Sequence, residues 1–113
     1  MLKLKAYGEE HKISLYTCHY INNDNLAVQM WCWDDEEFPE LWSTLTVNLT
    51  KKCKPNCVFI DINNNDNHII DWLIENKLGT PTGNYETSGY CTYPEFEFDM
   101  EELNKYIRED IVC

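Results

Sequence analysis

The fold is decided by residues 58–99, which read VFIDINNNDNHIIDWLIENKLGTPTGNYETSGYCTYPEFEFD. At the start of this stretch Val58, Ile60 and Ile62 occupy every second position, and a period of two residues predicts a β-strand. The asparagine run at 63–65 supplies side chains that favour left-handed and Asx turns. We therefore expect the strand to end in a turn at these asparagines.

A helix is expected directly after the turn. Asp66 or Asn65 can cap its first turn through a side-chain oxygen. Gly79 is placed to end the helix, since glycine readily adopts the left-handed conformation that closes helices. One face of the helix is apolar and is expected to be buried: Ile69, Ile70, Leu73 and Ile74. An ordered loop and a final strand then complete the stretch.

The flanking sequence adds further strands. Gly8 is placed for a turn, and residues 21–25, INNDN, indicate an asparagine-type hairpin turn. Around these turns the apolar residues alternate, and the expected strands cover residues 2–6, 13–17, 26–33 and 42–49.

The C-terminal residues predict a second helix. Asp99, with Glu102 three positions later, forms a capping box. The buried stripe of this helix is expected to consist of Leu103, Tyr106, Ile107 and Ile111. Five or six strands, interrupted and followed by two helices, predict a single α+β domain over residues 1–113 with a mainly antiparallel sheet.

Four motifs are spread along the chain: TLTVNL at 44–49, FIDINNN at 59–65, GTPTG at 79–83 and YCTYP at 90–94. Together they resemble a small uncharacterised family of proteins carried by phages and plasmids of Gram-positive bacteria. In that family we expect a TLTVNL strand, a D-x-NNN turn, a GxPTG loop and a CTYP strand. The resemblance extends over nearly the whole chain and implies a shared fold, but it carries no catalytic signature. The genetic setting that it implies is the main guide to function.

The composition predicts a soluble intracellular protein. Of 113 residues, 43% are hydrophobic, which is enough for one modest core. No apolar run approaches the roughly 18 residues that a membrane span needs. The N-terminus, MLKLKAYGEE, lacks the apolar stretch of a secretory signal. We therefore expect a cytoplasmic protein of the bacterial host, with no membrane partner.

The six cysteines are expected to be reduced, because disulfides are rare in proteins that stay inside the cell. Cys18, Cys32 and Cys91 are interpreted as buried strand residues, since free cysteine is among the most buried residue types. Cys53 and Cys57 lie instead in KKCKPNC, a polar loop. Its three lysines are expected to lower the pKa of both thiols and favour the thiolates.

This cysteine pair predicts a structural zinc site. Zinc ligands within one turn are usually two to four residues apart, and Cys53 and Cys57 fit that spacing. Cys113 is expected to be a third ligand. Further ligands are available among Cys18, His19 and Cys91. The alternative is that Cys53 and Cys57 are two exposed thiols with no metal.

Within the composition, charge gives the strongest indication of function. Twenty acidic and nine basic residues leave a net charge of −11, which repels nucleic acid and favours basic protein surfaces. One acidic run contains Asp34, Asp35, Glu36, Glu37 and Glu40, and the flanking aromatic residues are Trp31, Trp33, Phe38 and Trp42. The run is either a solvated loop or a partner-binding patch with aromatic anchors inside a charged rim.

An enzyme is not expected, because the chain has no nucleophile elbow, phosphate-binding loop or His-Glu-x-x-His motif. Proteins similar in size, charge and provenance include anti-CRISPR proteins. The first hypothesis is therefore an inhibitor that blocks nucleic-acid loading by a host defence nuclease, with a Cas9-type effector as the suspected partner. The second hypothesis is a phage or plasmid accessory, a structural or regulatory module with no defence target.

Overall fold

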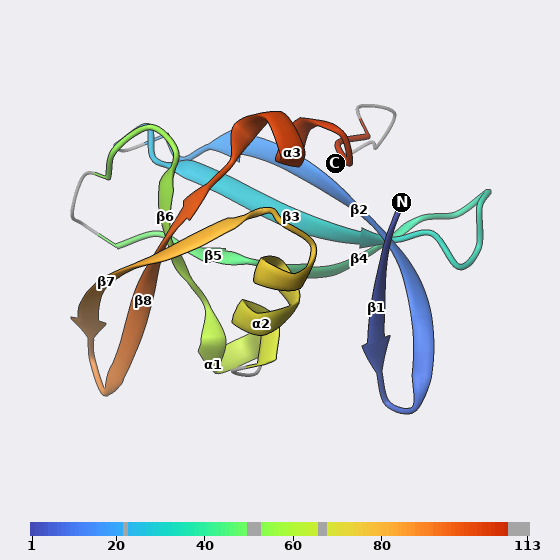
Figure 1. The fold of residues 1–113 in the computed structure, drawn as a ribbon, viewed down its shortest axis with the longest axis horizontal. Coiled ribbons are helices and arrows are strands. Elements are labelled where there is room, and N and C mark those ends of the chain that lie inside the picture. The colour runs from blue at the N-terminus through green and yellow to red at the C-terminus, as the bar shows by residue number, and fades with distance from the viewer. Residues whose placement is uncertain (22, 50–52, 66–67, 109–113) are drawn as a thin grey trace.

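A computed structural model of the chain describes residues 1–21, 23–49, 53–65 and 68–108. The strands within these residues form two antiparallel four-stranded sheets (Figure 1). The first sheet has the order β1 (Leu2–Ala6), β2 (Glu9–His19), β3 (Leu26–Cys32), β4 (Glu40–Thr44). The second has the order β5 (Thr46–Val47), β6 (Cys57–Ile60), β8 (Cys91–Phe98), β7 (Gly79–Ser88). Three short helices accompany them in the described residues: α1 (Ile62–Asn65), α2 (His68–Glu75) and α3 (Met100–Asn104).

The predicted α+β class with mainly antiparallel strands is confirmed, while the described residues hold eight strands in two sheets and three helices, where five or six strands and two helices were expected. The strand expected over 42–49 is divided at Leu45, whose side chain is fully buried. The Leu45 amide donates to the carbonyl of Val28 in the first sheet, at 2.8 Å. The Leu45 carbonyl accepts from the amide of Asp61, next to β6 of the second sheet, also at 2.8 Å. Leu45 therefore leads the chain from one sheet to the other.

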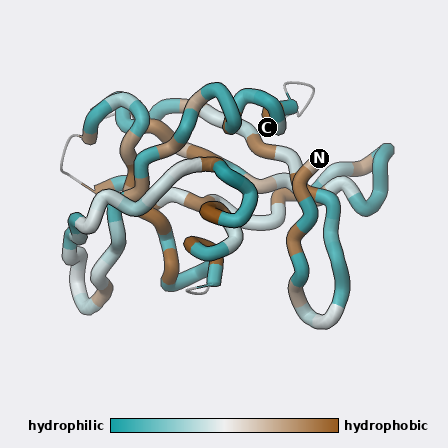
Figure 2. Tube along the Cα trace, in the orientation of Figure 1, coloured by the Kyte–Doolittle hydropathy of each residue, from teal (hydrophilic) through white to brown (hydrophobic). Residues whose placement is uncertain are grey.

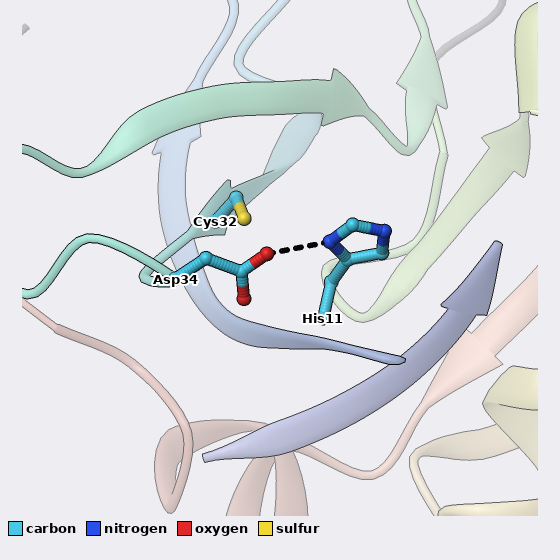
Figure 3. A group of neighbouring side chains, drawn as sticks. All are labelled: His11, Cys32 and Asp34. Carbon is cyan, nitrogen blue, oxygen red and sulfur yellow. Dashed lines mark hydrogen bonds and ion pairs between the residues drawn. The ribbon is translucent and has the colours of Figure 1, made fainter. Parts of the chain in front are cut away.

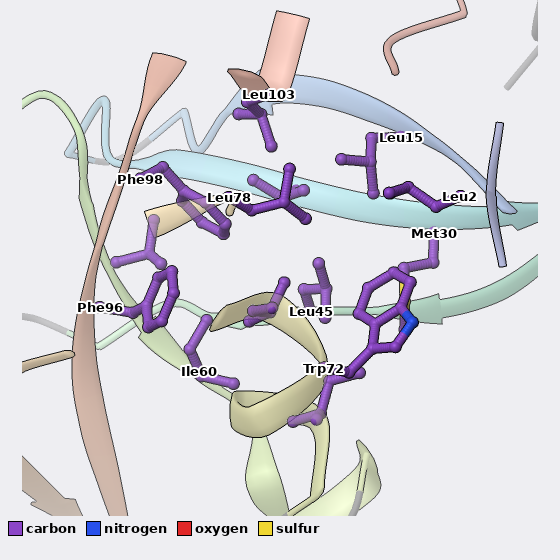
Figure 4. Packing of buried hydrophobic residues seen from close by; sticks show 14 of the residues in the cluster. Leu2, Leu15, Met30, Leu45, Ile60, Trp72, Leu78, Phe96, Phe98 and Leu103 are labelled. Carbon is purple, nitrogen blue, oxygen red and sulfur yellow. The ribbon is translucent and has the colours of Figure 1, made fainter. Parts of the chain in front are cut away.

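One main hydrophobic core lies between the two sheets and α2 (Figure 4). Phe96 and Phe98 of β8 meet edge to face in it, with ring centroids 5.2 Å apart. Leu103 of α3 closes one end of the core and is fully buried. Each such buried side chain contributes roughly 1.5–3 kcal/mol to stability relative to an exposed one.

The turn predicted at residues 63–65 is the short helix α1. Asp61 caps it, because its Oδ1 atom accepts from the Asn64 amide and its carbonyl from the Asn65 amide, both at 3.2 Å. None of the asparagines at 63–65 has a positive φ angle, so the left-handed turn expected there is absent. Of the two caps expected for the next helix, Asp66 lies outside the described residues and Asn65 is the last residue of α1.

The helix stop predicted at Gly79 lies two residues earlier, at Lys77. Lys77 has a left-handed φ of 60°, and its amide donates to Ile74 while the Leu78 amide donates to Leu73, both at 3.0 Å. These two bonds form a Schellman motif. Gly79 instead begins β7, so residues 79–83, expected as a loop, belong to a strand that has a register shift between Pro81 and Tyr85.

The buried face of α2 also differs from the prediction. Ile69 and Leu73 are buried as expected, whereas Ile74 is 41% exposed. Trp72 is buried in addition, and its Nε1 donates to the carbonyl of Lys3 at 2.8 Å. This hydrogen bond ties α2 to β1, although 69 residues separate the two partners.

Of the capping box predicted for α3, the part formed by the Asp99 side chain is confirmed. The Asp99 side chain accepts from the amides of Glu101 and Glu102. The reciprocal bond of a capping box is absent, because the Asp99 amide donates to Leu78 at 2.8 Å and Glu102 accepts from Lys105 at 2.7 Å. Of the expected buried stripe, only Leu103 lies in α3 and is buried. Tyr106 and Ile107 lie beyond the end of this helix at Asn104 and are half-buried, and Ile107 forms a bridge with Leu15 of β2. Ile111 lies outside the described residues.

Two hairpins and one loop project from this core (Figure 1). β1 and β2 form the hairpin on one side, and β7 and β8 form the hairpin on the other. The loop between β3 and β4 projects beside the first hairpin, and its tip is hydrophilic (Figure 2). None of the helices in the described part of the chain has the length and apolar character that a membrane crossing requires.

Candidate functional site

The loop between β3 and β4, residues 33–39, carries most of the predicted acidic run, and we call it the acidic loop. All five predicted partner-binding residues are exposed: Asp34, Asp35, Glu36, Glu37 and Glu40, the last of which begins β4. Asp34 pairs with His11, and Glu36 pairs with Lys12 at 3.4 Å. The other three carboxylates make no ion pair with a described residue. They are therefore available to a partner.

The aromatic residues beside the acidic loop divide into packing and surface residues. Trp33 is buried, its Nε1 donates to Ser14 at 2.6 Å, and the Arg108 guanidinium lies 4.1 Å from the centre of its ring. Trp33 therefore packs within the fold. Phe38, in the acidic loop, is 69% exposed, and Trp31 and Trp42 are both half-buried. Phe38 and Trp42, which line the same surface hollow, therefore remain candidate anchors of the predicted patch.

His11 lies at the base of the acidic loop. It shares the inward face of β2 with Ile13 and Leu15, because alternate strand residues point the same way. Its side chain is only 13% exposed, and Nδ1 is 2.6 Å from Oδ2 of Asp34. The His11 ring also packs against the Trp42 ring, with centroids 4.6 Å apart and planes tilted by 41°.

Cys32 and Asp34 meet His11 at this point (Figure 3). Cys32 ends β3 and pairs across the sheet with Ile13. The ligand atoms of Cys32, Asp34 and His11 all lie within 4.8 Å of one another. This is the one group of three or more potential metal ligands among the described residues, and we call it the His–Cys–Asp cluster.

Hydrogen bonds and burial set the charges in the His–Cys–Asp cluster. The Lys12 amide, 3.0 Å from Oδ1 of Asp34, lowers the pKa of that carboxyl, and the hydrogen bond from His11 lowers it further. The hydrogen bond to Asp34 in turn raises the pKa of His11. Burial raises the pKa of the Cys32 thiol. Without a metal the cluster therefore favours an imidazolium, a carboxylate and a neutral thiol.

A β-bulge in β4 places Trp42 between two hollows. Met30 pairs with Ser43 and Trp31 with Leu41, which leaves Trp42 as an extra residue, and such bulges redirect a side chain. On one side a hollow of about 330 Å³, which we call the loop hollow, is lined by the His–Cys–Asp cluster and the start of β4. On the other side a groove of about 920 Å³, the β1–α2 groove, separates β1 from α2. Trp42 lines both.

The β1–α2 groove combines aromatic walls with carboxylates. Trp72 of α2 and Trp42 of β4 line it, and the acidic and basic residues of the lining are Lys5, His68, Asp71 and Glu75. The hydrogen bond from Trp72 Nε1 to the Lys3 carbonyl links α2 to β1 beside the groove. The β1–α2 groove and the loop hollow thus adjoin at Trp42.

The predicted zinc ligands Cys53 and Cys57 are packed rather than exposed. Both are buried in a small second cluster with Leu49 and Phe59. Contrary to expectation, burial raises the pKa of Cys57 to about 11, helped by nearby glutamates, and Lys54 has only a smaller opposing effect. Their thiols therefore have a packing role. The expected partner ligand Cys113 lies outside the described residues, so a zinc site there stays a prediction.

The other cysteines also differ from their predicted burial. Cys18 is exposed, and Cys32 and Cys91 are half-buried. His19, next to Cys18, is exposed as well. Sequence reasoning missed His11 and Cys32 as possible ligands. The alternation of His11 with Ile13 and Leu15 could have indicated the site, because it places a histidine on the side of the strand that faces the core.

The His–Cys–Asp cluster suits cation binding better than nucleophilic catalysis. A nucleophilic cysteine requires a lowered pKa and a base within reach. Burial raises the pKa of Cys32, and the Nδ1 atom of His11 is occupied by Asp34. Imidazole, thiolate and carboxylate are instead a common ligand set for a transition metal.

A family model described as a domain of unknown function, DUF4313, matches residues 14–113. The chain belongs to the DUF4313 family. The matched segment contains Cys32, Asp34, the acidic loop and Trp42, and it begins after β1 and His11. One wall of the β1–α2 groove and one member of the His–Cys–Asp cluster thus lie outside the part that the family model covers. No curated protein and no solved structure matched the chain.

Proposed function

We propose that this chain is a non-enzymatic binding protein that occupies a basic surface of a partner protein in the cytoplasm of a bacterial host. The observation that carries the proposal is the acidic loop beside Trp42. Exposed carboxylates line the loop hollow together with Phe38 and Trp42, and Trp42 also lines the β1–α2 groove. Aromatic anchors inside a charged rim are typical of protein interfaces, and tryptophan also attracts Lys and Arg side chains.

The charge of the chain supports a partner that handles nucleic acid. A net charge of −11 repels phosphates, whereas a channel that binds a nucleic-acid backbone is rich in Lys and Arg. The resemblance to proteins of phages and plasmids directs the choice to a defence nuclease. We name a Cas9-type effector first, because its guide-and-target channel is basic and recognises the backbone rather than the sequence. In this role the acidic face prevents nucleic-acid loading.

The experiment measures binding of the purified chain to a Cas9-type effector by interferometry, together with DNA cleavage. The test variant is Asp35→Asn, Glu36→Gln, Glu37→Gln, which removes three exposed charges and keeps the Asp35 oxygen that accepts from the Glu37 amide. We expect association to slow by about tenfold at low salt, since rim charges act mainly on the association rate.

The matched control is Asp24→Asn, Glu97→Gln, Glu101→Gln, which removes three exposed charges from the β2–β3 turn, β8 and α3. If the control slows association as much as the loop variant, binding depends on net charge and the assignment to the acidic loop is wrong. If wild-type protein neither binds nor inhibits the effector, the partner class is wrong. Capture of another basic host protein without nuclease inhibition would then support the accessory role.

A further inference from the structure

We propose that His11, Cys32 and Asp34 bind one zinc ion, with the fourth coordination position open to the loop hollow. These residues differ from the Cys53–Cys57 pair that the sequence indicates, and the proposal is independent of the proposed function. The three ligand atoms belong to β2, the end of β3 and the acidic loop, and they lie within 4.8 Å of one another (Figure 3). In Figure 3 the side chains of Cys32 and Asp34 face the ring of His11.

The distances between the three ligand atoms fit a zinc site after small movements of the side chains. With zinc–ligand bonds of about 2.0–2.3 Å, neighbouring donor atoms of a tetrahedral site are about 3.3–3.7 Å apart. The 2.6 Å contact between His11 Nδ1 and Asp34 Oδ2 would lengthen as the ion enters between them. The thiol of Cys32 would move inward by side-chain rotation. No change of backbone register is needed, because the ligands already lie within one ion's reach.

Groups around the His–Cys–Asp cluster hold the ligands in place, as outer-shell partners do in metal sites. The Lys12 amide donates to Oδ1 of Asp34 at 3.0 Å and leaves Oδ2 for the ion. The Trp42 ring packs against the His11 ring and restricts its rotation. Strand pairing between Ile13 and Cys32 fixes the thiol relative to β2.

The loop hollow provides access and a candidate fourth ligand. Glu40 pairs with Cys32 across the sheet and lines the hollow with it, so its carboxylate or a water molecule can complete the site. Exposed acids of the loop also concentrate cations near this point. The ligand chemistry favours zinc over magnesium or calcium, because both of those ions prefer oxygen ligands alone.

Binding also balances the charges of the cluster. The ion takes Cys32 as thiolate, His11 as neutral imidazole and Asp34 as carboxylate, so the thiol proton and the imidazolium proton pass to the solvent. The two negative ligands then neutralise the two positive charges of zinc. Zinc affinity should therefore rise with pH, as it does wherever a metal displaces protons.

The experiment titrates zinc into the untagged, metal-free full chain by calorimetry, and cobalt in parallel by absorption. We expect one equivalent of zinc and a thiolate-to-cobalt charge-transfer band. Cys32→Ser should abolish the band, and Asp34→Asn and His11→Gln should each weaken zinc affinity at least tenfold. The control Cys57→Ser removes a buried thiol elsewhere and should keep both the stoichiometry and the band.

A second measurement uses the wild-type chain, so it does not depend on the folding of any variant. Zinc should slow alkylation of Cys32 in the native protein and leave alkylation of the exposed Cys18 unchanged. Absence of zinc binding, or protection of Cys53 and Cys57 in place of Cys32, would overturn the assignment. Retention of the cobalt band in Cys32→Ser would overturn it equally.

Discussion

Substitution of Gly79 by alanine should destabilise the protein by about 3 kcal/mol. A Cβ atom on Gly79 would overlap the Glu97 carbonyl oxygen and lie 2.7 Å from the Phe96 ring, whereas carbon atoms pack at about 3.5–4.0 Å. Phe96 is fully buried and cannot move aside. β7 must therefore separate from β8 near the Gly79–Phe98 pair. Overpacking of this kind typically costs about 1–3 kcal/mol, and each lost strand hydrogen bond adds about 1 kcal/mol.

Urea unfolding followed by tryptophan fluorescence measures this change in the free energy of unfolding. Gly83→Ala is the control, because a Cβ there meets no atom within 4 Å and only the positive φ of 88° opposes it. We expect this control substitution to lower the free energy of unfolding by about 1 kcal/mol. Lys77→Gly should stabilise the chain by about 0.5–1 kcal/mol, since glycine suits the left-handed end of α2. Equal costs for both alanine variants, or destabilisation by Lys77→Gly, would refute this account of the α2–β7 junction.

Two further predictions concern titratable groups. Asp34→Asn should lower the pKa of His11 toward its ordinary value of 6.5, because the hydrogen bond to Asp34 is the largest cause of its rise; an unchanged His11 pKa in an NMR titration contradicts this. The stabilising effect of the pair should be greatest between pH 3.8 and 6.5, the ordinary values of the two groups. This stabilising effect should disappear as the pH rises through the raised pKa of His11, because the imidazole then loses its charge. It should also disappear as the pH falls through the lowered pKa of Asp34, because the carboxylate then gains a proton. Cys57 has a pKa raised to about 11, so in native protein at pH 8 it should be alkylated far more slowly than the exposed Cys18. Mass spectrometry measures the two alkylation rates. Equal rates would show that the Cys57 thiol is not buried as described.

Local patterns in the sequence predicted several elements correctly. The alternation in β1, β2 and β3, the hairpin turn before Leu26 and the Asp99 cap of α3 all involve residues within a few positions of one another. Strand period and helix capping are interactions over two to four residues, so one chain segment determines them. Net charge and the exposed acidic loop also follow from the sequence, because charged side chains remain in water unless they are paired.

Only the tertiary structure decided where the sheets divide and which functional groups meet. Leu45 changes sheets because Val28 and Asp61, distant in sequence, take its two backbone hydrogen bonds. His11 approaches Asp34 across 23 residues, through strand register and a loop that no local period encodes. Cys57 is buried because β6 pairs with β8, which reverses the effect expected from the nearby lysines. Burial and proximity depend on contacts between distant segments, and these contacts determine both the charge of a thiol and the make-up of a site.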